Sequence, residues 1–167
     1  MKEFISDCGL GIADCGLRVS GFRVFGFDHE FKEWSIRLFE DFEAGKKIAI
    51  VSDITLDELT DAPEQVQDIF KTIPDNSLEI LTSDAESRKL ADKYITEHAV
   101  SGKFYEDALH IAIATISRVN VLASWNFRHI VNLDRIRMYN SVNLKNGFSI
   151  LEIRSPREIL KFDDNDD

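Results

Sequence analysis

The sequence predicts a three-layer α/β/α fold with a mainly parallel β-sheet, built from 167 residues. Short apolar runs alternate with longer stretches in which apolar residues recur every three or four positions, and this alternation of strands and helices is typical of a parallel sheet. Residues 48–51 are apolar throughout, as expected for a strand that helices cover on both faces. No linker rich in proline, glycine or serine divides the chain, so we expect a single domain.

The first half of the chain predicts a long helix, a strand and two shorter helices. The long helix is expected over residues 30–44, because apolar residues recur at every fourth position before a glycine: Trp34, Leu38, Phe42 and Gly45. The strand at 48–51 follows. Two helical stripes come next, interrupted by one proline and ended by another: Leu56 and Leu59, then Pro63, then Val66, Ile69, Phe70 and Ile73, then Pro74.

The second half predicts further strands and helices in alternation. A strand at 78–81 leads into a helix that Thr82 or Ser83 caps and whose inner face carries Leu90, Tyr94 and Ile95. Beyond Gly102, a strongly apolar helix over about 105–117 precedes a strand at 119–123. In the remaining pattern, residues 125–130 lead into a short helix. One or two last strands are expected at 136–139 and 149–153, and a final helical turn begins at Ser155 and Pro156.

The charge balance limits how the protein can contact nucleic acid. The chain has 30 acidic and 20 basic residues, for a formal net charge of -10, and part of the excess lies in the acidic tail at 163–167. Such a surface disfavours broad, non-specific attraction to nucleic acid. Acids gathered at one place can nevertheless bind Mg²⁺, which then supplies the positive charge that meets a phosphate.

The sequence also predicts a cytoplasmic protein with no membrane span. No apolar stretch reaches the roughly 18 residues that a spanning helix needs, and an acid as early as Glu3 argues against a secretory signal. Cys8 and Cys15 are the only cysteines. Because neither has a Cys/His pair at zinc-site spacing, we expect two free thiols rather than a disulfide or half of a metal site.

Polar residues fall where the predicted strands end. Asp53 and Glu58 follow the strand at 48–51, Ser124 and Asn126 follow the strand at 119–123, and Asp107 lies in the first turn of the apolar helix. In an open parallel sheet, ligands bind beyond the carboxyl ends of the strands, where the following helices also begin. These side chains are therefore expected at one edge of the sheet.

The residue types at this edge suit a hard, oxygen-preferring cation. Carboxylates with an amide and a hydroxyl, and no cysteine, favour Mg²⁺ or Mn²⁺. Asp107 begins an apolar helix, so its carboxylate is expected to be partly buried and to need a cation or the helix N-terminus as partner. His110, on the same face, is expected to be a core histidine satisfied by hydrogen bonding. The reaction class that this set serves best is metal-assisted phosphodiester hydrolysis.

Three segments of the chain resemble consecutive signature segments of PIN domains. They are Val-Ser-Asp-Ile-Thr-Leu-Asp-Glu-Leu at 51–59, Tyr-Glu-Asp-Ala-Leu-His-Ile-Ala-Ile-Ala at 105–114 and Leu-Ala-Ser-Trp-Asn-Phe-Arg-His at 122–129. The third is similar to a bacterial branch in which Ser-Trp-Asn-Phe replaces the usual acidic motif. The resemblance implies a PIN-like domain over 28–162, preceded by an atypical N-terminal segment, 1–27, that includes a candidate first strand.

PIN domains cleave RNA with one or two Mg²⁺ or Mn²⁺ ions, often as the toxin of a VapC-type toxin–antitoxin pair. The resemblance implies that Glu58 is the family's second acid, Asp107 its third and Asn126 the replacement for a later acid, and that these three residues hold the metal. Ser124 and Asn126 would position the attacking water or the phosphate. An antitoxin protein and a second copy of the chain are the partners that the resemblance implies.

The family's first acid has no counterpart at its usual place. It normally ends the first strand, some ten residues before the first helix, but the corresponding stretch, 17–27, contains no acid. Asp7 and Asp14 lie upstream, whereas Asp28 is expected to cap the helix that follows it. The sequence leaves the first acid as Asp7, Asp14 or none.

Two other readings remain beside the ribonuclease. The absent first acid and the amide of Asn126 suit a weakened or inactive PIN fold that binds RNA or a partner protein without cutting. A nucleotide-binding α/β domain is disfavoured, because no glycine-rich phosphate loop follows a predicted strand. Arg118, Arg128 and Arg135 are candidate phosphate contacts, with solvated surface charges as the alternative.

Overall fold

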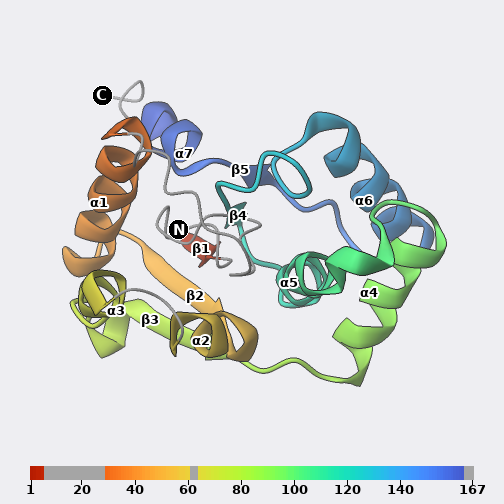
Figure 1. The fold of residues 1–167 in the computed structure, drawn as a ribbon, viewed down its shortest axis with the longest axis horizontal. Helices are drawn as coiled ribbons and strands as arrows, with labels where there is room; N and C mark the ends of the chain where they lie inside the picture. The colour runs from red at the N-terminus through yellow and green to blue at the C-terminus, as the bar shows by residue number, and fades with distance from the viewer. Residues whose placement is uncertain (6–28, 61–63, 164–167) are drawn as a thin grey trace, which may run out of the picture.

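The computed structural model describes residues 1–5, 29–60 and 64–163. Their strands form one sheet in the order β3-β2-β1-β4-β5, and every neighbouring pair is parallel. The strands are β1 (Lys2–Ile5), β2 (Ile48–Ser52), β3 (Leu78–Leu81), β4 (Val121–Ala123) and β5 (Ile153–Arg154). Helices cover both faces of this sheet, so the predicted three-layer α/β/α fold is confirmed (Figure 1).

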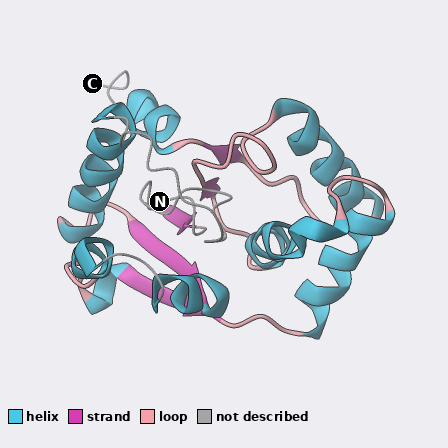
Figure 2. Ribbon diagram, viewed as in Figure 1, coloured by secondary structure: helices cyan, strands magenta, loops and turns pink. Residues whose placement is uncertain are grey.

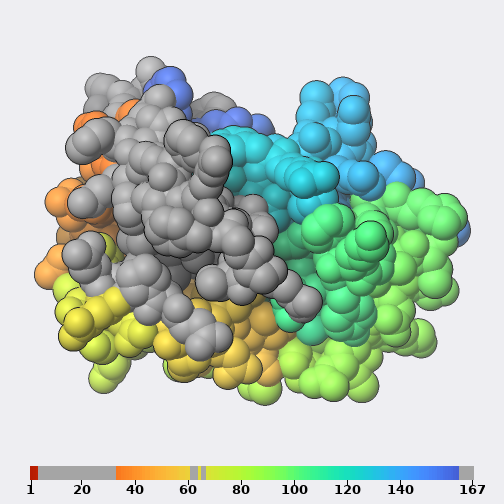
Figure 3. Space-filling view, in the orientation of Figure 1, coloured from red at the N-terminus to blue at the C-terminus, as the bar shows by residue number. Residues whose placement is uncertain are grey.

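The helices of the described ranges divide between the two faces (Figure 2). One group comprises α1 (His29–Glu43), α2 (Asp53–Thr60), α3 (Glu64–Phe70) and α7 (Pro156–Asp163). The other comprises α4 (Ala85–Thr96), α5 (Tyr105–Ile116) and α6 (Leu133–Lys145). In the space-filling view, α4 in green and α6 in blue form one flank of the molecule (Figure 3). Within the described part of the chain, no helix combines the length and apolarity needed to cross a membrane.

Alternation along the strands builds a core on each face of the sheet. In β2, Ala49 and Val51 pack in the cluster formed with α1 and α7, whereas Ile50 packs in the cluster formed with α4, α5 and α6. Leu122 of β4 lies in the same cluster as Ile50. Because side chains alternate between the faces of a strand, apolar residues at every position are required when helices cover both faces. This explains the unbroken apolar run at 48–51.

The central strand is β1, which lies between β2 and β4. The family resemblance aligns a first strand with residues 17–27, which lie outside the described residues, whereas the structure forms its first strand at Lys2–Ile5. Asn120 fixes the start of this strand: the backbone N–H of Lys2 donates to Asn120 Oδ1 over 2.8 Å, and the Asn120 N–H donates to the Lys2 carbonyl over 3.1 Å.

Most predicted elements are confirmed, but the chain between β4 and β5 differs. Residues 125–130 lead into a helix as predicted, with a turn at 127–130, but this helix, α6, has 13 residues and includes residues 136–139, for which a strand was predicted. Asn132 begins α6 by accepting from the Arg135 N–H, and the buried Tyr139 and Asn143 then recur one turn apart. Of the stretch 149–153, only its last residue belongs to β5.

The ends of two helices show how local side chains set their bounds. Asp84, not Thr82 or Ser83, caps α4: its carboxylate accepts from the Ser87 N–H over 2.7 Å, and Ser87 Oγ accepts from the Asp84 N–H over 2.9 Å. This is a capping box, in which two donors are satisfied reciprocally. The final helical turn predicted from Ser155 and Pro156 is confirmed as α7.

Candidate functional site

The strand order reverses at the centre of the sheet, between β1 and β4. In doubly wound sheets, the crevice for a ligand forms beyond the carboxyl ends of the strands at this switch point. Ser124 and Asn126 follow directly after β4, and Glu58 lies on α2, which continues from β2. Asp107 lies in the first turn of α5, the helix that returns to β4. The four predicted site residues therefore gather at the carboxyl edge.

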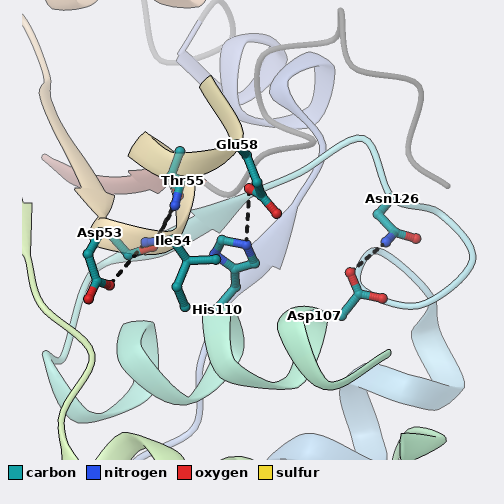
Figure 4. A network of polar contacts seen from close by, with 8 residues as sticks. Asp53, Ile54, Thr55, Glu58, Asp107, His110 and Asn126 are labelled. Atoms are coloured by element: carbon teal, nitrogen blue, oxygen red, sulfur yellow. Dashed lines mark hydrogen bonds and ion pairs between the residues drawn. The ribbon is translucent and has the colours of Figure 1, made fainter. Parts of the chain in front are cut away.

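Asp107 and Asn126 are in direct contact (Figure 4). Nδ2 of Asn126 donates to Oδ1 of Asp107 over 3.2 Å, and the Asp107 side chain is half-buried. Burial, and after it the charge of Asp107, raises the pKa of the Tyr139 hydroxyl. The negative charge of Asp107 therefore acts on the buried hydroxyl of Tyr139.

The loop after β4 fixes the orientation of the Asn126 amide. Oδ1 of Asn126 accepts from the backbone N–H of His129 over 2.9 Å. A backbone N–H can pair only with the oxygen of the amide, so the nitrogen is the atom that faces Asp107. Ser124 Oγ accepts from the Asn126 N–H over 3.0 Å and secures the same turn. In this arrangement Asn126 serves Asp107 as a donor, and Ser124 shapes the loop.

Glu58 and His110 form the second contact of the site. Oε2 of Glu58 lies 3.4 Å from Nε2 of His110, which is fully buried (Figure 4). His110 follows Asp107 by three positions on α5, so both side chains leave the helix on one face. The sequence predicted His110 as a core histidine on the face of Asp107, and the structure buries it fully; its contact with Glu58 was not predicted.

Asp53 is separated from the site by its own contacts. Its carboxylate accepts from the Ser83 N–H over 3.0 Å and from Ser83 Oγ over 2.9 Å. It therefore ties the start of α2 to the loop after β3. Asp57 is exposed, and Glu58 is the acid of α2 that the structure brings to His110.

The three arginines considered as phosphate contacts differ in position. Arg118 follows the C-terminal end of α5, and about 14 Å of helix separates that end from Asp107. Arg135 donates through Nη1 to the Ala99 carbonyl over 2.6 Å and is committed to the end of α4. Arg128 is exposed and lies two residues after Asn126, so it is the one of the three that remains a candidate phosphate contact.

Several sequence-based predictions fall outside the described residues. Asp7 and Asp14, the candidates for the first acid, are among these, and so are Cys8, Cys15 and the capping role of Asp28. The last described residue of β1 is Ile5, whose Cα partner is Ala123, the residue before Ser124. The first acid accordingly remains a prediction from the sequence.

The donor atoms at this edge fit a hard divalent cation in kind. Glu58 and Asp107 offer carboxylate oxygens, which Mg²⁺ and Mn²⁺ prefer, and Mg²⁺ sites commonly use one or two carboxylates together with waters and a phosphate. Among the described residues, no group of three or more His, Cys, Asp or Glu side chains is arranged to hold a metal. These residues therefore supply a pair of carboxylates rather than a complete set of ligands.

The chain was also compared with known proteins. No protein-family model matches it, and no curated protein does. The functional assignment accordingly depends on the three sequence segments and on the geometry at the carboxyl edge of the sheet.

Proposed function

We propose that the protein is a PIN-like ribonuclease that hydrolyses RNA phosphodiester bonds with Mg²⁺ or Mn²⁺. The observation that carries the proposal is the position of Glu58 and Asp107 at the switch point of a parallel sheet: Glu58, on α2, contacts His110, which lies one turn along α5 from Asp107. The contact of each acid with a residue of the site, His110 and Asn126, supports it. A cytoplasmic setting, a homodimer and an antitoxin protein as partner belong to the same proposal.

Each residue has a defined role in this proposal. Glu58 and Asp107 hold the metal, which when bound supplies charge neutralisation and water activation at the phosphate. Asn126 donates to Asp107 and so keeps its carboxylate turned toward the site, while Ser124 holds the loop that carries Asn126. The exposed Arg128 contacts a phosphate of the RNA.

The second candidate is a PIN-like fold that binds RNA or a protein without cutting. The orientation of Asn126 favours it, because the amide turns its nitrogen toward Asp107, while its oxygen, the atom that could have replaced a carboxylate ligand, faces the His129 N–H. With fewer charged ligands, metal affinity falls, and metal-dependent cleavage falls with it.

Cleavage of a labelled single-stranded RNA tests the proposal. The parent should cleave in Mg²⁺ or Mn²⁺ and stop in EDTA. Asp107→Asn and Glu58→Gln should each lose more activity than the roughly 10- to 100-fold typical of groups that only orient a metal ligand. The matched controls are Glu106→Gln and Asp57→Asn, which change the exposed neighbouring acids and should retain activity.

Equal cleavage by the parent and Asp107→Asn would refute the role of Asp107. A parent that binds RNA but cleaves it in neither metal would refute the ribonuclease and favour the second candidate. Thermal unfolding during a Mn²⁺ titration separates the two further, because a specific site stabilises the fold by mass action.

A further inference from the structure

His110 is a buried polar residue on an otherwise apolar helix. Its neighbours Ala108, Leu109, Ile111 and Ala112 are buried, and His110 itself is 0% exposed. Burying an imidazole among apolar side chains is costly unless the ring meets a polar group. The structure places this ring against a carboxylate of the candidate site rather than only within the core.

One oxygen of the Glu58 carboxylate is buried against His110, while the rest of the side chain is partly exposed. Oε2 lies 3.4 Å from Nε2 of His110 and is inaccessible to solvent. The Glu58 side chain as a whole is 29% exposed, so the exposure falls on its remaining atoms. One oxygen is thus directed to the imidazole, and the side chain reaches the edge of the sheet with its position set.

His110 also links the two acids of the site. It lies one helical turn after Asp107, so the ring that contacts Glu58 rises from the same face of α5 as the Asp107 carboxylate. A glutamate side chain has several rotatable bonds, and ordering it costs free energy when a ligand binds. An imidazole fixed in the core reduces that cost before the ligand arrives.

We infer that His110 is a positioning residue, which holds the Glu58 carboxylate where it can share one divalent cation with Asp107. The inference rests on the proposed function, because it concerns the same metal site. Groups that orient metal-ligating carboxylates contribute about 10- to 100-fold to metal affinity. His110 acts through Glu58 and does not itself touch the RNA.

The test compares two replacements of similar size. His110→Leu removes the polar contact, whereas His110→Gln carries an amide nitrogen that can reach the place of Nε2. The dissociation constant of Mn²⁺ is measured from the electron paramagnetic resonance signal of free Mn²⁺, with thermal unfolding in EDTA recorded for each variant. We expect His110→Leu to bind Mn²⁺ about 10- to 100-fold more weakly, and His110→Gln to recover most of the affinity.

RNA cleavage separates positioning from catalysis. For His110→Leu, the concentration of Mn²⁺ that gives half-maximal cleavage should rise, while kcat at saturating Mn²⁺ should stay close to that of the parent. In the Glu58→Ala background, His110→Leu should cause no further loss of Mn²⁺ affinity, because the residue through which it acts is already gone. A histidine with a purely structural role would change the unfolding temperature in EDTA and leave these metal constants unaltered.

The outcomes distinguish this inference from the proposed function. If the parent binds Mn²⁺ and Glu58→Gln weakens binding, but His110→Leu binds as the parent does, only the positioning role is overturned. If the parent neither binds Mn²⁺ nor cleaves RNA, the proposed function fails and the inference fails with it. Should His110→Leu not fold, His110→Asn replaces it: its shorter amide cannot reach the place of Nε2, so it should lose the affinity that His110→Gln keeps, and equal affinity in both would contradict the inference.

Discussion

Asn126→Asp is the substitution whose effect on stability the structure specifies most closely. In the parent, the amide accepts from the His129 N–H on one side and donates to Asp107 over 3.2 Å on the other. An aspartate keeps the first contact, because a carboxylate oxygen also accepts. On the second side it places a carboxylate oxygen opposite that of Asp107, so an attraction becomes a repulsion.

The magnitude follows from the distance between the two side chains. At the 3.2 Å that separates Nδ2 from Oδ1, two unit charges repel by roughly 5 kcal/mol at an effective dielectric constant of about 20, and by roughly 1 kcal/mol in bulk water. Asp107 is half-buried, which places the pair between these limits. With the lost hydrogen bond included, we expect the free energy of unfolding to fall by about 2–4 kcal/mol in the absence of metal.

Urea denaturation at pH 7 in EDTA measures this loss. The control is Asn132→Asp, which adds the same charge at the N-cap of α6, where aspartate serves as well as asparagine and meets the helix dipole favourably. The loss at position 126 should shrink on acidification, because protonating either carboxyl removes the repulsion, and Mn²⁺ should stabilise the variant more than the parent. An Asn126→Asp variant as stable as the parent in EDTA would refute the reasoning.

Three further predictions concern other parts of the chain. Asp84→Ala should lower the free energy of unfolding by about 1 kcal/mol in urea titrations. The backbone N–H of Ser87 donates to the Asp84 carboxylate and holds its pKa below the usual range, so the loss of stability should be full at neutral pH and shrink below about pH 4. Asn143→Leu should cost about 1–3 kcal/mol in the same assay, because the buried hydroxyl of Tyr94 donates to Asn143 Oδ1. Asp7→Asn should reduce Mn²⁺-dependent RNA cleavage more than Asp14→Asn does, because β1 ends only two residues before Asp7. If both variants cleave RNA as fast as the parent, neither residue is the first acid.

The fold could be predicted largely because burial leaves a mark on the sequence. Strands covered on both faces need apolar residues at every position, and residues 48–51 show this directly. The region from 125 to 139 could not be read in the same way. Ile136, Met138 and Tyr139 form a short run that suits a strand or a helix equally, and only the cap at Asn132 and the buried Asn143 decide for a helix.

The candidate site was predictable in its residues but not in its contacts. Their position after a strand indicated both Asp53 and Glu58 as site residues. Only the packing of α2 distinguishes them, because it places Asp53 against Ser83 and Glu58 against His110. The amide orientation of Asn126 likewise depends on a backbone N–H three residues further along, which no residue pattern specifies. Sequence position reveals which groups share an edge, and tertiary packing determines which atoms they present.

The central claim is that Glu58 and Asp107 together hold one divalent cation. A crystal of the parent protein soaked in Mn²⁺ tests it most directly, through the anomalous difference map collected at the manganese absorption edge. We expect one strong peak bonded to a carboxylate oxygen of each residue, and its loss in Asp107→Asn. A peak bonded to neither carboxylate, or no peak at saturating Mn²⁺, would contradict the claim.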